Sequence, residues 1–173
     1  MENMRTVGEA APDEELTPTD VEIRDQSFEE RMRARRLQRE QRTTESFDVP
    51  GFEDLFRVEM QVIGYKRLAD VALRHARVRD EALRTLYIAA DQILMATVGF
   101  HRVKDEGGYE QADGDTWLSL ARSFDNTIDA TLRPRAALIR LLEGAGVIAL
   151  NNDWYEWNTR GNQTVDKELA GDF

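Results

Sequence analysis

Residues 79–100, RDEALRTLYIAADQILMATVGF, carry the clearest periodic pattern in the chain. Large apolar residues recur every three or four positions, which is the spacing of one face of an α-helix. Asp80 stands where a helix N-cap is favoured, and Gly99 stands where a helix commonly ends. The apolar positions of this face are Leu83, Leu86, Tyr87, Ala90, Ile93, Leu94 and Ala96 to Val98. We expect this helix to organise the hydrophobic core.

The flanking segments predict further helices. Tyr65, Leu68, Ala72 and Ala76 lie at helical spacing, which predicts a helix that ends at about residue 78. Later in the chain, the pattern predicts helices over about 116–124, 133–143 and 146–159, with Gly144 and Gly146 separating the last two. The core candidates of this part are Leu138, Ile139, Leu141 and Leu142.

The segment SFDVPGFEDLFRVEMQVIG, residues 46–64, allows two interpretations. Pro50-Gly51 is a turn signal and a partial alternation follows it, which favours a short β-hairpin near 46–62. Phe56, Met60 and Ile63 also lie at helical spacing, so the first turns of a helix fit as well. The predicted fold class is therefore mainly α, a compact helical domain of about four to six helices with at most this hairpin.

Composition limits the classes of protein. The chain has 173 residues, 41% apolar and 32% charged, as expected for one soluble domain with room for a disordered part. The formal net charge of −10 argues against nucleic acid as the main partner. The absence of cysteine excludes disulfides and thiolate zinc sites. Neither a signal peptide nor a membrane-length apolar stretch is visible, so we expect a cytosolic protein.

Charge is distributed unevenly along the chain. Residues 1–30 contain ten acids against Arg5 and Arg24, too polar a composition to form a core. The next segment, RMRARRLQREQR at 31–42, has six arginines against Glu40. We therefore predict a disordered acidic arm at 1–27, a basic helix or linker at 28–44, a helical domain at 45–160 and a flexible tail at 161–173.

The arginine-rich segment has a functional and an ordinary interpretation. Guanidinium groups pair well with phosphates, so the segment is a candidate nucleic-acid contact. The interpretation as a solvated helix that pairs with nearby acids is favoured, because no aromatic residue is interleaved to stack on bases. The candidate residues are Arg31, Arg33, Arg35, Arg36, Arg39 and Arg42.

Catalytic and cofactor motifs are not found. His75 and His101 belong to no recognisable nucleophile or metal motif, and the chain has neither a P-loop nor a dinucleotide fingerprint. The acidic loop VKDEGGYEQADGDT, residues 103–116, does not match the spacing of a calcium-binding loop. We expect a protein without enzymatic activity, metal or cofactor.

Aromatic residues near the end of the chain are the strongest candidates for binding. Trp154 and Trp157 share a helix face, and Tyr155 points elsewhere. Packing into the core is the favoured interpretation, since large rings are mostly buried. The alternative is a partner-binding surface, in which aromatic residues often dominate the affinity. The partner-binding candidates are Trp154, Tyr155, Trp157, Trp117 and Phe100.

Several stretches together resemble the tail assembly chaperones of long-tailed bacteriophages, especially those that infect actinobacteria. They are FDVPGFEDLFRVEM, RDEALRTLYIAADQILMATVGF, the acidic loop, RPRAALIRLLEG and WYEWNTRGNQTVDKELAGDF, and together they span about residues 46–173. The resemblance implies a mostly helical protein of the host cytoplasm that coats the tape-measure protein, helps to recruit tail-tube subunits and is absent from the mature virion. It also implies that a longer, frameshifted form exists in many relatives. Two alternatives stay open: a structural virion or connector protein, and a nucleic-acid-binding regulator that uses residues 31–42.

Overall fold

The computed structural model describes residues 27–41 and 44–171, without the side chains of 35–41 and 161–171. The predicted acidic arm, apart from residue 27, lies outside the described residues, as do 42–43 and 172–173. The chain divides into two compact units, Met1–Gln41 and Arg42–Phe173, and each is described by itself.

The first unit contributes one described helix, α2 (Phe28–Gln41). Its start is fixed by a reciprocal cap. The backbone N–H of Glu30 donates to Ser27 Oγ at 3.2 Å, and the backbone N–H of Ser27 donates to Glu30 Oε2 at 2.9 Å. This capping box satisfies two backbone donors that a helix start otherwise leaves open.

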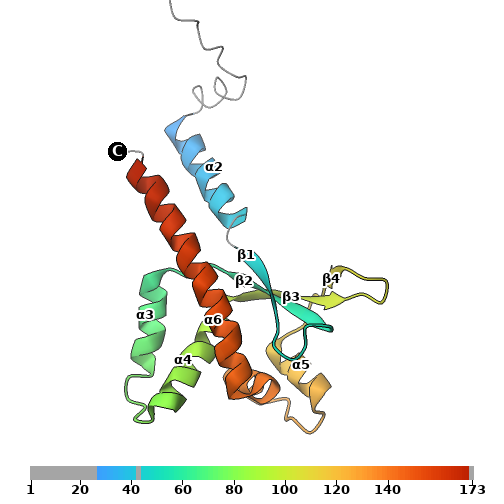
Figure 1. The fold of residues 1–173 in the computed structure, drawn as a ribbon. Helices are drawn as coiled ribbons and strands as arrows, with labels where there is room; N and C mark the ends of the chain where they lie inside the picture. Colours follow the sequence, from blue (N-terminus) through green and yellow to red (C-terminus); the bar gives the residue numbers. More distant parts are fainter. Residues whose placement is uncertain (1–26, 42–43, 172–173) are drawn as a thin grey trace, which may run out of the picture. The chain divides into compact units, whose positions relative to one another are not determined.

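The second unit contains a four-stranded antiparallel sheet, which the expectation of a mainly α, all-helical domain did not include. Its strands are β1 (Thr44–Asp48), β2 (Phe56–Gln61), β3 (Thr97–Val103) and β4 (Tyr109–Gln111), in that order across the sheet. With five helices in the described ranges, the fold is mixed α/β, and the predicted fold class is wrong. Figure 1 shows the sheet beside the helices of this unit.

The hairpin alternative for the opening segment is the one that forms. The backbone N–H of Phe52 donates to the carbonyl of Val49 at 2.9 Å, and Gly51 has a φ of 83°. Proline followed by a residue of positive φ is the pattern of a type II turn, so the predicted turn at Pro50-Gly51 is confirmed. Along β2, buried and half-buried residues alternate, as in a strand with one face on the core.

The central helix, α4 (Glu81–Ala96), is confirmed, but its predicted end is wrong. Asp80 caps its start by accepting from the backbone N–H of Leu83 at 2.9 Å. Thr97 is already extended, and the chain passes directly into β3, where Gly99 lies opposite Glu59 of β2. β-Branched and aromatic residues favour a strand. Of the apolar residues after Ala96, Phe100 is buried in the core, whereas Val98, which was predicted on the apolar face of the helix, is exposed.

The acidic loop is shorter than predicted, because part of it pairs as a strand. Gly107 and Gly108 both have positive φ, and they turn the chain back so that β4 pairs with β3. The backbone N–H of Lys104 donates to the carbonyl of Gly108 at 3.1 Å and closes this turn. Only three residues pair on the β4 side, which is too short for a periodic signal in the sequence.

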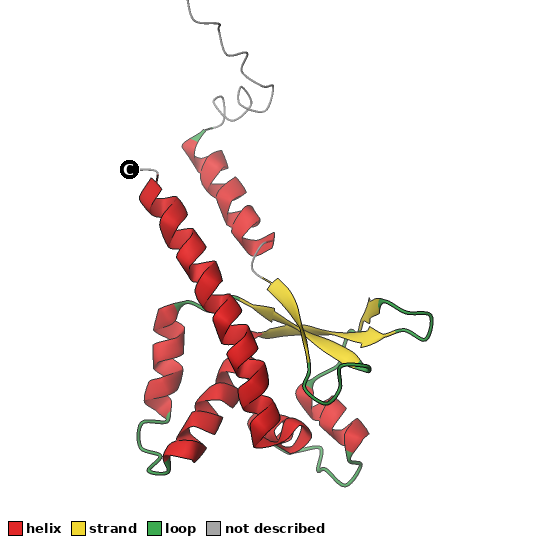
Figure 2. Cartoon of the chain, in the orientation of Figure 1, coloured by secondary structure: helices red, strands yellow, loops and turns green. Residues whose placement is uncertain are grey.

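Three further helices complete the unit: α3 (Tyr65–Arg74), α5 (Trp117–Phe124) and α6 (Pro134–Gly171). The two helices predicted at 133–143 and 146–159 form this one element, which has a non-helical break at Glu143. Helix continues to Gly171, where a flexible tail was expected. Figure 2 shows α6 as the longest helix of the unit, passing in front of the sheet.

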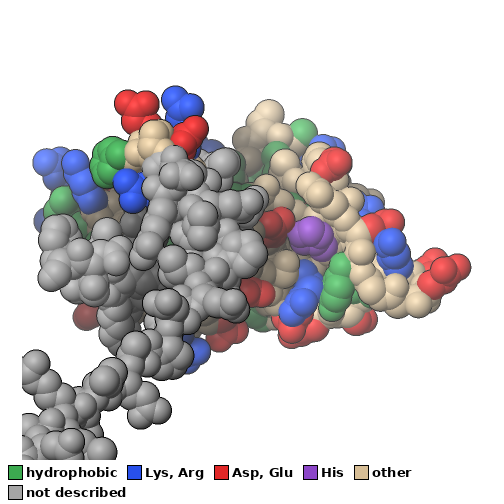
Figure 3. All heavy atoms as spheres, turned by 90° about the horizontal axis from the view of Figure 1, so that it is seen from above, with side chains coloured by type: hydrophobic (Ala, Val, Ile, Leu, Met, Phe, Trp, Pro, Cys, Tyr) green, Lys and Arg blue, Asp and Glu red, His purple; other side chains and the backbone are tan. Residues whose placement is uncertain are grey.

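One hydrophobic core joins the sheet to α4, α5 and α6. Its fully buried side chains include Val58 and Met60 of β2, Ile93 of α4, and Leu138 and Leu150 of α6. The opposite face of the sheet is polar, with His101 paired to Glu59 at 3.1 Å. Figure 3 shows acidic and basic side chains interspersed over the region of β3 and β4. Among residues 44–171, the sheet therefore packs against the core through one face.

Candidate functional site

The terminal aromatic residues mostly face the inside of the protein. Trp154 is completely buried, and its indole Nε1 donates to the carbonyl of Gln61 at 3.1 Å. Trp157 is half-buried and meets Phe47 of β1 edge to face, with ring centroids 5.7 Å apart. Only Tyr155 is exposed, with 43% of its surface accessible. Two of these three rings therefore attach α6 to the sheet.

A buried asparagine strengthens the same attachment. Asn158 Oδ1 accepts from the backbone N–H of Ile63 at 2.7 Å, and its Nδ2 donates to the carbonyl of Ile63 at 3.1 Å. Both polar atoms of the amide are therefore satisfied without water. The pairing joins residues 95 positions apart, so a local sequence pattern cannot predict it.

The other two aromatic candidates, Trp117 and Phe100, are also buried. Their rings meet edge to face at 5.0 Å, and Trp117 Nε1 donates to Thr97 Oγ1 at 3.0 Å. The hydroxyl of Thr97 in turn donates to the carbonyl of Ile93 at 2.8 Å. This chain of bonds holds the junction of α4 and β3, and both rings are almost completely buried there.

The arginine-rich segment is described in part. Arg31 and Arg33 are exposed on α2. Arg35, Arg36 and Arg39 belong to the same helix, but their side chains lie outside the description, and Arg42 lies outside it entirely.

A hollow of the second unit lies between α4 and the first turns of α6, at a place that the sequence did not indicate. Its volume is about 890 Å³. We call it the α4–α6 groove. It is lined by Leu83, Leu86, Tyr87, Asp91 and Leu94 of α4, Phe124 of α5, and Arg133, Pro134, Arg135, Ala136, Ile139, Arg140 and Glu143 at the start of α6.

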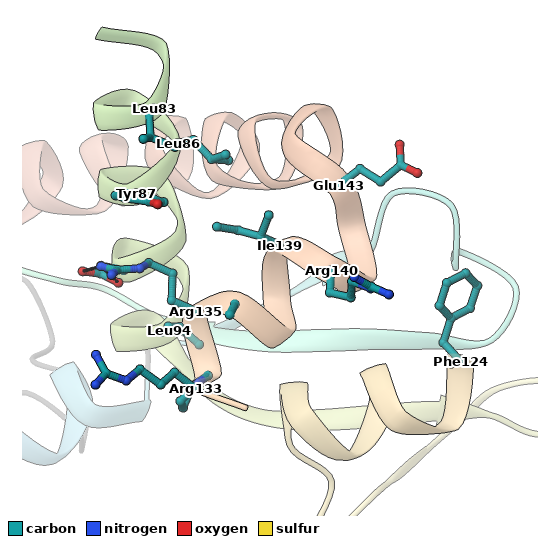
Figure 4. Close-up of a pocket in the computed structure, with 13 residues that line it drawn as sticks. Leu83, Leu86, Tyr87, Leu94, Phe124, Arg133, Arg135, Ile139, Arg140 and Glu143 are labelled. Carbon is teal, nitrogen blue, oxygen red and sulfur yellow. Dashed lines mark hydrogen bonds and ion pairs between the residues drawn. The ribbon is translucent and has the colours of Figure 1, made fainter. Parts of the chain in front are cut away.

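The floor of the groove is apolar and remains open. Figure 4 shows Leu83, Leu86 and Tyr87 along α4 facing Ile139 of α6, with Phe124 beyond Arg140. Leu83 is 39% exposed and Phe124 is 62% exposed. A second hollow of about 470 Å³ shares Leu94 and Pro134 with the groove, so the concave surface continues toward β3. Exposed apolar area that is continuous in this way marks a binding surface more often than scattered single residues do.

One wall of the groove is held by a compact group of charges. His75 Nε2 lies 2.7 Å from Asp91 Oδ2, and Arg135 approaches the same oxygen at 3.3 Å. The guanidinium of Arg135 also lies 4.4 Å from the ring centre of Tyr87. These contacts join the end of α3 to α4 and α6. Asp91 and Arg135 neutralise each other, and the histidine stays buried beside them.

The loop before α6 is fixed by two aspartates. Asp125 accepts from Thr127 Oγ1 at 2.6 Å and from its backbone N–H at 3.0 Å, and these two bonds, with a smaller effect of Arg140, lower the pKa of Asp125. Asp129 bonds the backbone N–H and hydroxyl of Thr131 in the same way, which lowers its pKa as well. Both carboxylates stay charged, and their hydrogen bonds stabilise the loop that precedes Arg133 and Pro134 of the groove.

The residues that line the groove are apolar, arginine or acidic. None of the thirteen described residues that line it is a serine, cysteine, lysine or histidine. Elsewhere in the described ranges, no group of three His, Asp or Glu side chains has the arrangement of a metal site. The apolar floor and the charged rim suit a partner that is apolar on one side and polar at its edges.

Comparison with models of known protein families, with curated proteins and with solved structures finds no match for this chain. Within 27–41 and 44–171, no helix combines the length and apolarity needed to cross a membrane.

Sequence reasoning missed the groove because its residues come from three separate segments. Arg133, Arg135 and Arg140 recur through the start of α6, which is the one local signal that one edge of this helix is basic. Leu83, Leu86 and Tyr87 were assigned to the core face of α4, and the structure leaves all three only partly covered.

Proposed function

We propose that this protein is a tail assembly chaperone of a long-tailed bacteriophage, which binds the tape-measure protein and helps to recruit tail-tube subunits without catalysing a reaction. The observation that carries the proposal is the open, apolar α4–α6 groove on a packed α/β body. The resemblance of residues 46–173 to this family supplies the identity of the partner. In this proposal the protein acts in the host cytoplasm and is absent from the finished particle.

The groove suits the proposed partner physically. A helix-rich protein exposes an apolar stripe before it is assembled, and such stripes bind in grooves between helices of another protein. Covering the stripe removes apolar area from water at about 25 cal/mol per Å², which lowers the tendency to aggregate. The net charge of −10 keeps the resulting complex soluble.

Co-expression tests the proposal. The tape-measure protein of the same genome should aggregate when expressed alone and should become soluble when this chain is co-expressed. The two proteins should then co-purify in a fixed ratio. A tape-measure protein that stays insoluble in the presence of excess chaperone would contradict the proposal.

The position of the protein during assembly gives a second test. A chaperone leaves the particle, whereas a connector or structural tail protein remains in it. Quantitative mass spectrometry of purified virions should detect at most traces of this chain. A fixed number of copies per particle would favour the connector alternative.

A further inference from the structure

We infer that the α4–α6 groove selects an amphipathic helix with acidic flanks, with Arg133 and Arg140 as the residues that recognise the acids. The inference rests on the proposed function and adds to it the chemistry of the bound segment. It follows from which charges of the groove are already paired inside the protein and which are not.

Arg135 is the arginine of the groove whose charge is paired within the protein. It contacts Asp91 at 3.3 Å and lies over the ring of Tyr87 at 4.4 Å, so its charge is balanced within the wall of the groove. A partner gains little from it, because an arginine held in this way has already formed its hydrogen bonds and its stacking contact. The charge pair fixes the shape of the groove.

Arg133 and Arg140 differ from Arg135 in this respect. Both are exposed, and Arg133 has no ion-pair partner among the described residues. Arg140 reaches Asp125 only at 3.5 Å, and 64% of its side chain is accessible. Helix α6 begins at Pro134, directly after Arg133, and the start of a helix adds positive partial charge. Glu143 is the one acid of the lining outside the Asp91 pair, and it lies near Arg140 and far from Arg133.

The floor determines the rest of the occupant. Leucine and isoleucine side chains at i, i+3, i+4 and i+7 of a partner helix form a stripe that fits between Leu83 and Leu86 on one side and Ile139 on the other. Acids beside such a stripe then reach the two exposed arginines at the rim, of which Arg140 has only a long contact with Asp125. Paired rim charges of this kind contribute mainly to selectivity and to the rate of association.

The net negative charge of the whole chain does not by itself favour an acidic partner. At a net charge of −10, the average field of the protein attracts basic peptides and repels acidic ones. A preference for an acidic helix therefore has to come from a local feature. We expect the attraction of Arg133 and Arg140 for nearby acids to exceed the repulsion by the net negative charge of the chain at short range.

The experiment uses the full chain and three labelled synthetic peptides of about five helical turns. The first has leucines at i, i+3, i+4 and i+7 with flanking glutamates; the second has lysines in place of the glutamates; the third is a scrambled form of the first. Fluorescence anisotropy at low salt should show binding of the acidic peptide at least about tenfold tighter than either control. The preference should decrease as salt is added.

Matched variants locate the site. Arg133→Glu combined with Arg140→Glu should weaken the acidic peptide about tenfold and improve the lysine peptide. Arg67→Glu combined with Arg74→Glu changes the net charge equally on the exposed surface of α3 and should leave the ratio between peptides unchanged. Leu83→Gln should weaken both peptides, whereas Leu73→Gln, at an exposed leucine of α3, should weaken neither. Thermal melts verify that each variant is folded.

Several results would overturn the inference. They are equal binding of the acidic and lysine peptides, equal losses in the two double-arginine variants, and no loss in Leu83→Gln. Absence of peptide binding would overturn it too, whether a second copy covers the groove, seen as a dimer that Leu83→Gln dissociates, or acidic residues of this chain cover it, seen by intramolecular cross-linking. If peptide binding fails while co-expression still keeps the tape-measure protein soluble, the proposed function stands and only the groove chemistry is wrong.

Discussion

The two halves of α6 use their side chains in opposite ways. After the break at Glu143, the helix turns Trp154, Trp157 and Asn158 toward the sheet, where ring and amide contacts are completed inside the protein. Before the break, it leaves Arg133 and Arg140 exposed beside a groove that is only partly filled. Trp154 and Trp157 thus complete the interior, and the groove combines incompletely covered leucines with exposed arginines.

Substitutions in the part of α6 after Glu143 should reduce stability more than substitutions before it, and Trp154→Ala should have the largest effect. The change removes a fully buried ring and the hydrogen bond to the carbonyl of Gln61, so we expect a loss of about 3–5 kcal/mol in the free energy of unfolding. Urea denaturation followed by circular dichroism measures it. Tyr155→Ala, one residue away and exposed, should change stability by less than about 1 kcal/mol. Similar losses at the two positions would mean that Trp154 is not part of the core.

Asn158→Ala should have the next largest effect. It removes the two buried hydrogen bonds between the Asn158 amide and the backbone of Ile63, at a cost of about 1–3 kcal/mol. The control is Asn152→Ala, at an exposed position of the same helix. A melting temperature equal to that of the control would argue against the attachment of α6 through this amide.

The break between the two halves allows a prediction of opposite sign. Glu143 has φ 57° and ψ 173°, a region that is strained for any residue except glycine. Glu143→Gly should therefore raise the free energy of unfolding by about 1 kcal/mol. The same substitution at Glu156, within a regular part of α6, should lower it by about 1 kcal/mol. If both variants are destabilised, the strain at the break is absent.

The smallest effect concerns the loop that leads into the groove. Asp125 has a lowered pKa, so its contribution to stability is present above the ordinary aspartate pKa and is lost as the pH falls through the lower value in the folded protein. Thr127→Val removes the largest cause and should move the pKa of Asp125 back toward its usual range. Carboxyl NMR titration detects the change, and the pKa of Asp129 should stay where it is. An unmoved Asp125 pKa would show that Arg140 or the backbone controls it.

Local patterns predicted several local features correctly, although the ends of α3 and α4 lie earlier than expected. The Asp80 cap of α4, the turn at Pro50-Gly51 and helix α5 each depend on residues a few positions apart, and each is present. The sheet was missed for a physical reason. Thr97 continues the chain from helix into strand without a breaker, and β3 pairs with β2 some forty residues earlier, so only tertiary pairing separates Ala96 from Val98.

The candidate site was beyond the reach of the sequence for a related reason. Whether a leucine of α4 is buried depends on how closely the distant segment α6 packs against it, which the local pattern of α4 does not contain. The same periodicity therefore marks Ile93, which is fully buried, and Leu83, which is not. The burial of Trp154 could be argued from ring size, but its hydrogen bond to Gln61 could not.

Hydrogen–deuterium exchange of the full chain, with and without the co-purified tape-measure protein, tests the central claim most directly. We predict added protection in residues 83–94 and 133–143, which form the groove, and no change around Tyr155 or in α2. Protection confined to the exposed side of residues 154–157 or to α2, with the groove segments unchanged, would contradict the claim that this protein binds its partner between α4 and α6.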